Sequence, residues 1–243
     1  MKTHRSATPP ERPVRRPFCP PDSLPAVAAS LPARAVVARA LGEFLILSVM
    51  MTIVPLVLAI DLIILDQPIN ERSWTEAAQH VFILLTFLRF ALYARRHPSS
   101  RGFSILAAGF FGCMAIREFD SLFDHICHGF WLYPALLLAA VSVWRATADG
   151  RNSVLAGIAS FVNSRAYYPI LFGLLILLVF SRSFGSGQLL WHHLLDDNNA
   201  RFFKTALQES LELLGYMFLF HGARLYTRRE ASPRPPPPGF AAA

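Results

Sequence analysis

Segment 117–128 gathers ionisable side chains in a chain where only 16% of the 243 residues are charged. On a helical wheel at about 100° per residue, its polar residues share one arc of about 160°, and apolar residues fill the rest. The spacing therefore predicts a helix with one ionisable face and one apolar face. The ionisable face consists of Arg117, Glu118, Asp120, Ser121, Asp124, His125 and His128.

A second polar stripe lies within the apolar stretch 202–223. Glu209, Glu212 and Tyr216 follow one another three and four residues apart, which places them on one side of a helix. Carboxylates inside a membrane span are costly, and they normally face a bundle interior or a water-filled cavity. We expect the two stripes to lie at similar depth and to face each other.

Divalent metal binding is the first chemistry that these residues favour. Asp120, Asp124 and His128 recur every four residues, and Glu209 and Glu212 would approach from the second helix. Mixed nitrogen and oxygen ligands suit Zn, Mn or Fe, and a bound ion would activate water for membrane-embedded hydrolytic or redox chemistry. The supporting residues would be Arg117, Glu118, Ser121, His125 and Tyr216.

Two other classes of function stay open. In a proton- or cation-coupled small transporter, the same carboxylates would act as relay groups. In a structural or assembly protein, Arg117 would neutralise Glu209 or Glu212 and lock two helices together. Residues 120–128 would alternatively form an amphipathic helix on the outer leaflet, with its polar face toward water.

The elements that must position these residues are six apolar stretches, because crossing about 30 Å of hydrocarbon takes about 20 helical residues. We expect an all-α, polytopic membrane bundle with about six transmembrane helices. The third apolar run, 103–116, would reach only about 21 Å, so its helix should continue through residue 122. The expected spans cover 41–65, 77–94, a third from 103, a fourth ending near 144, 167–180 and 202–223.

The ends of the chain differ from this 41–226 membrane domain. Residues 1–40 form a basic, Pro-rich and disordered tail with a short interfacial helix over 25–40, and residues 227–243 form a second Pro-rich disordered tail. Sixteen Lys and Arg residues fall on one side of six spans and five on the other, which predicts cytoplasmic termini.

Composition also suggests where the protein acts. The high content of Ala, Arg and Pro suggests a bacterial inner (plasma) membrane. The expected partners are the lipid bilayer and either a second copy of the chain or another membrane protein. Nucleic acid is excluded as a partner, because the basic residues flank apolar runs and do not form one face of a domain.

Overall fold

The computed structural model describes residues 32–64, 73–148, 151–186, 191 and 197–229. These residues are predominantly helical and include no strand, which confirms the predicted all-α class for this part of the chain. The chain divides into two units, 1–45 and 46–243, and the packing described below belongs to the second. The predicted disorder of residues 1–31 and 230–243 lies outside the described residues.

Most of the helices follow the apolar stretches. Two of them are prolonged by a turn of π-helix, at Ile60–Ile64 and Ile176–Phe180. These two are α1 and α7. The described α-helices are α1 (Ala33–Ala59), α2 (Trp74–Arg96), α3 (Arg101–Glu118), α4 (Asp120–Asp124), α5 (Leu132–Ala148), α6 (Arg151–Val162), α7 (Tyr167–Leu175), α8 (Ser181–Gly185) and α10 (Asp197–Arg229).

Four helical stretches are long and apolar enough to cross a membrane: Ala33–Ile64, Trp74–Arg96, Pro98–Glu118 and Tyr167–Gly185. They match the first, second, third and fifth predicted spans. α5 is apolar but has only 17 residues. α10 has 33 residues, but its predicted span carries three charged side chains. Length and composition therefore support four of the six predicted spans.

In the described residues, helices α1 and α10 extend into the two predicted tails. Residues 33–40 belong to the long helix α1 and do not form a separate interfacial helix. At the other end, α10 continues through Arg229, two residues into the predicted C-terminal tail.

α2 begins at a buried carboxylate. Asp61, only 1% exposed, accepts hydrogen bonds from the backbone N–H groups of Trp74 and Thr75, each at 2.9 Å, and from the Thr75 hydroxyl at 2.6 Å. The Ser73 hydroxyl accepts the Glu76 N–H at 3.2 Å, as an N-cap does. α2 ends before Pro98, because a proline disfavours helical backbone in the residue before it.

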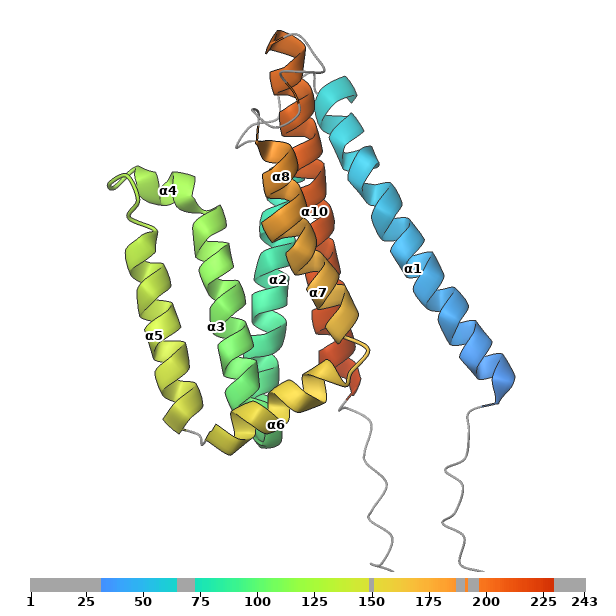
Figure 1. Ribbon diagram of the computed structural model, residues 1–243, viewed down its shortest axis with the longest axis vertical. Coiled ribbons are helices and arrows are strands. Elements are labelled where there is room, and N and C mark those ends of the chain that lie inside the picture. The colour runs from blue at the N-terminus through green and yellow to red at the C-terminus, as the bar shows by residue number, and fades with distance from the viewer. Residues whose placement is uncertain (1–31, 65–72, 149–150, 187–190, 192–196, 230–243) are drawn as a thin grey trace, which may run out of the picture. The chain divides into compact units, whose positions relative to one another are not determined.

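α10 is the central helix of the second unit. It packs against α2, α7 and α8, while α3 packs between α2 and α5 (Figure 1). The main core forms around Ile83, Phe90, Leu219 and Tyr226. α10 and α7 approach closely at two glycines, because a Cβ on Gly173 would lie 2.9 Å from the carbonyl oxygen of Gly215.

Candidate functional site

The predicted continuous helix over 117–128 is interrupted at Phe119. α3 ends at Glu118, Phe119 has φ −93° and ψ 20°, and the five-residue helix α4 follows. Figure 1 shows α4 turned away from the axis of α3, on the way to α5. The single helical wheel therefore does not apply across this break, and Glu118 separates from Asp120 and the residues that follow it.

The polar residues after the break organise a turn. Asp124 accepts the Gly129 N–H at 3.0 Å and contacts Nδ1 of His128 at 3.2 Å. Gly129 has φ 78°, a left-handed conformation that glycine adopts most readily. The hydrogen bond from Gly129, reinforced by His128, keeps the pKa of Asp124 below its ordinary value.

The remaining side chains of this turn face outward. The His128 side chain is 98% exposed, and Asp120 and His125 are exposed as well. Nδ1 of His125 lies 2.8 Å from the carbonyl oxygen of Ser121, one turn earlier. Leu122 and Ile126 expose apolar surface between these polar groups. This pattern resembles the alternative prediction for residues 120–128, an amphipathic segment at the membrane surface, more than a buried site.

The carboxylates of α10 form hydrogen bonds with neighbouring helices. Nε2 of Gln79 on α2 donates to the Glu209 carboxylate at 2.9 Å and to the Glu209 carbonyl at 3.1 Å. Gln79 is 1% exposed, and Glu209 is half-buried. A neutral amide therefore joins α2 to α10 at this carboxylate.

Glu212 lies one turn further along α10 and is buried. The Ser181 hydroxyl on α8 donates to its Oε1 at 2.6 Å, and Nε2 of Gln208 donates to the same oxygen at 3.1 Å. Ser181 is fully buried, so this bond forms away from solvent. α8 and α10 are thus joined by a second carboxylate with neutral donors.

Glu118 completes the cluster from the end of α3. Its carboxyl group forms a side-chain hydrogen bond with Tyr216, whose ring is buried on α10. Its electrostatic interactions also extend to Glu209 and Glu212. His80 on α2 places Nε2 2.9 Å from the Glu118 carbonyl oxygen and stacks on Phe119, with ring centroids 4.3 Å apart.

The structure therefore brings together four of the predicted site residues, which we call the carboxylate cluster: Glu118, Glu209, Glu212 and Tyr216. Asp120, Asp124 and His128 remain on the exposed turn. Among the described residues, no three His, Cys, Asp or Glu side chains are grouped so that they could hold a metal ion. The five predicted ligands do not converge, because the break at Phe119 directs three of them outward.

Arg117 does not pair with the carboxylates of α10. Its side chain is exposed, and it acts on Glu118 and Tyr216 only through longer-range electrostatics. The partners of Glu209 and Glu212 are the neutral groups described above. The predicted ion pair is therefore wrong. The cause lies in the helix geometry, since Arg117 and Glu118 differ by about 100° around α3 and only Glu118 faces the bundle.

Two residues of the cluster's surroundings were absent from the sequence-based prediction. Gln79 and Ser181 are neutral, and each lies on a helix that pairs with α10 only through tertiary packing. Gln79 did carry a signal, because it is an amide in a predicted span. Ser181 carried none, because a serine in a helix commonly bonds its own backbone.

The arrangement as a whole is a set of three carboxyl groups contributed by α3 and α10, of which Glu212 is buried and Glu118 and Glu209 are half-buried. Two amides, two hydroxyl groups and an imidazole surround it. No family model, curated protein or solved structure matches this chain.

Proposed function

We propose that this chain is a small proton- or cation-coupled membrane transporter, with the carboxylate cluster as its coupling site. The observation that carries the proposal is the set of partners around Glu118, Glu209 and Glu212. Among the described residues, none of the three forms an ion pair with an arginine or lysine side chain. Ionisable residues placed in this way inside membrane bundles mark ion pathways and proton relays.

A transporter must span the membrane, and four helices are long and apolar enough to do so. We propose that α5 and α10 cross as well, which gives six spans. α5 would extend about 25 Å and α10 about 50 Å at 1.5 Å per residue. The carboxylates of α10 form hydrogen bonds with α2 and α8, so they would not face lipid. We also propose cytoplasmic termini, which the excess of basic residues on one side supports, and a bacterial inner membrane.

Proton exchange is the chemistry that this geometry favours. The three carboxylates interact electrostatically and repel one another when all are ionised, so protons or a cation would be shared among them. Glu209 is half-buried and Glu212 is buried, which orders them from the outside inward. The Tyr216 hydroxyl beside Glu118 can both donate and accept a hydrogen bond, as a relay group must.

A structural role is the second candidate, and one observation favours it. Each carboxyl group bonds to a different helix: Glu209 to α2, Glu212 to α8, and Glu118 of α3 to α10. The cluster would then lock the helices without exchanging protons. A hydrogen-bonded lock needs an acceptor oxygen at position 212, whereas a relay needs a group that titrates.

The experiment separates these two requirements at one hydrogen bond. Glu212→Gln retains an acceptor oxygen for Ser181 but removes the titrating group. Ser181→Ala removes the donor and leaves the carboxyl. Both variants and the wild type are reconstituted into liposomes with an internal pH-sensitive dye, and a membrane potential drives proton entry. Infrared spectra at mildly acidic and mildly alkaline pH report protonated carboxyl groups in the same samples.

For a coupling site, Glu212→Gln should abolish potential-driven proton entry and reduce the infrared change, with little loss of thermal stability. Ser181→Ala should retain proton entry and lower the thermal stability. Two results support the structural role. Either Glu212→Gln retains full proton entry, or no sample, the wild type included, shows any proton entry. In both cases only Ser181→Ala, which lacks the hydrogen bond, should lose thermal stability. In either case the transporter proposal fails.

A further inference from the structure

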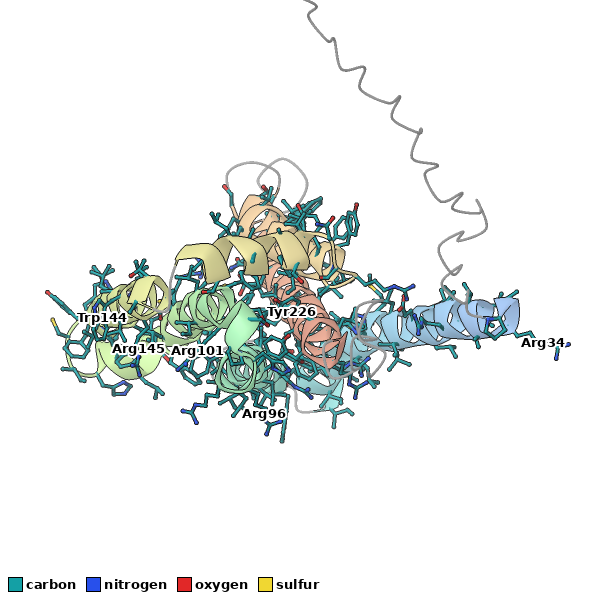
Figure 2. The ribbon with its side chains drawn as sticks, turned by 90° about the horizontal axis from the view of Figure 1, so that it is seen from below. Arg34, Arg96, Arg101, Trp144, Arg145 and Tyr226 are labelled. Atoms are coloured by element: carbon teal, nitrogen blue, oxygen red, sulfur yellow. The ribbon has the colours of Figure 1, made fainter. Side chains whose placement is uncertain are left out.

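Three arginines from three helices line one pocket at the opposite end of the bundle from the carboxylate cluster. Arg95 lies in the last turn of α2, Arg101 begins α3, and Arg145 lies in the last turn of α5. The pocket encloses about 260 Å³. Figure 2 views the bundle from this end and shows Arg101 and Arg145 on neighbouring helices, with Arg96 further along.

Below the arginines the pocket is apolar. Its walls include Phe87 on α2, Ile105 on α3 and Leu138 on α5, and no acidic side chain of the described residues lines it. Ala108 and Gly109 of α3 also line it. Gly109 is needed there because a Cβ would collide with the side chain of Ser142 on α5. The pocket thus combines a cationic mouth with a hydrocarbon wall.

We propose that this pocket binds one anionic phospholipid, with its phosphate at Arg95, Arg101 and Arg145 and an acyl chain along the apolar wall. The proposal requires the chain to lie in a bilayer but does not depend on the carboxylate cluster. Basic pockets between transmembrane helices on the cytoplasmic side bind anionic lipid headgroups. The excess of basic residues assigns this end to the cytoplasm.

The dimensions agree with a lipid. From Arg101 to Gly109, α3 rises about 12 Å, which is close to half of a hydrocarbon core of about 30 Å. A chain in one leaflet would therefore pass along the pocket wall while its headgroup stayed at the arginines. A soluble phosphate would fill the cationic mouth but would make no contact with the apolar wall.

Helix dipoles account for only part of this arrangement. Arg95 and Arg145 lie at helix C-termini, where a positive side chain is favoured in any case. Arg101 lies at the N-terminus of α3, where a positive charge opposes the dipole and an anion is favoured. A phosphate beside Arg101 would interact favourably with this helix end.

The test is lipid retention by the purified full-length protein, measured by native mass spectrometry with phosphatidylglycerol or phosphatidylcholine. The variant Arg95→Gln, Arg101→Gln, Arg145→Gln is compared with Arg39→Gln, Arg96→Gln, Arg228→Gln, which removes the same net charge from exposed arginines outside the pocket. The pocket variant should retain phosphatidylglycerol on the order of 100-fold more weakly. The control variant should behave as the wild type.

A second pair of variants tests the hydrocarbon wall without removing charge. Val141 lines the pocket and Val143 does not, and they are 44% and 54% exposed on the same helix, so both sites tolerate a larger side chain. Val141→Trp should fill the pocket and weaken retention at least tenfold, whereas Val143→Trp should not.

Several results would overturn the proposal. Equal losses in the two arginine variants would indicate general surface electrostatics. Equal retention of phosphatidylcholine would exclude anion recognition. Displacement of the lipid by inorganic phosphate would assign the site to a soluble anion. Full retention in Val141→Trp would show that no acyl chain occupies the pocket.

Discussion

Replacing Asp61 with alanine should destabilise the start of α2. The carboxylate of Asp61 accepts three hydrogen bonds, and Thr75, the donor of two of them, is fully buried. A buried donor left without an acceptor costs about 1–3 kcal/mol. The Thr75 hydroxyl can rotate toward another acceptor, but the two backbone N–H groups cannot. We therefore expect Asp61→Ala to lower the free energy of unfolding by about 3 kcal/mol.

The assay is reversible unfolding of the purified protein in mixed micelles. Asp61→Asn keeps one acceptor oxygen and should lose only about 1–2 kcal/mol. Thr75→Val should lose about 1 kcal/mol, and the double variant Asp61→Ala, Thr75→Val should lose less than the sum of the two single changes. Thr86→Val is the matched control, because Thr86 is also fully buried but bonds only the carbonyl oxygen of Phe82, within its own helix.

Loss of the hydrogen bonds to Asp61 should also affect the carboxylate cluster. Gln79 follows Thr75 by one turn, so fraying of the first turn of α2 would move its amide away from Glu209. Hydrogen exchange should therefore increase over 74–79 in Asp61→Ala. If the losses simply add in the double variant, or if Asp61→Ala is no less stable than Thr86→Val, the reasoning about the start of α2 is refuted.

Three further predictions concern single contacts. Gly215→Ala should cost about 1–3 kcal/mol, because the new methyl group meets Leu177 and the Gly173 carbonyl oxygen, whereas Gly42→Ala, with nothing within 4 Å, should be neutral or stabilising in the same unfolding assay. Gln79→Leu should leave Glu209 without its donor and lower the midpoint of thermal unfolding, and an unchanged midpoint would contradict the contact. Because the pKa of Asp124 is depressed, its turn-stabilising contribution is complete above the ordinary value of 3.8 and is lost as the pH falls through the lower folded pKa. Protection of the Gly129 amide from hydrogen exchange should follow that loss and should be absent at every pH in Asp124→Ala.

The sequence predicted the parts of this structure that depend on local pattern. Hydropathy located the four long apolar helices. The spacing of Glu209, Glu212 and Tyr216 placed them on one side of α10, where Glu212 and Tyr216 are buried and Glu209 is half-buried. The break at Phe119 was missed because neither glycine nor proline marks it. It becomes understandable only with the turn that Asp124 and Gly129 complete ten residues later.

The partners of the cluster could not be predicted for a different reason. Charge complementarity pointed to Arg117, the basic residue nearest in depth, but a difference of one residue around a helix decides which side chain faces the bundle. The contacts that formed use Gln79 and Ser181, whose distance from α10 in the sequence carries no information about pairing. Neutral donors carry no charge, so matching charged residues on two predicted helices cannot identify them.

This difference in partners bears directly on what the cluster can do. A guanidinium has only donors, so an arginine beside Glu212 would favour the ionised carboxylate and oppose its protonation. A hydroxyl both donates and accepts, so Ser181 can bond Glu212 whether or not that carboxyl carries a proton, and Tyr216 can do the same for Glu118. Such contacts maintain the helix packing across a change of protonation state. An ion pair with Arg117 would have made the helix packing depend on the charge of the carboxyl group. The hydrogen bonds with Ser181 and Tyr216 do not depend on that charge.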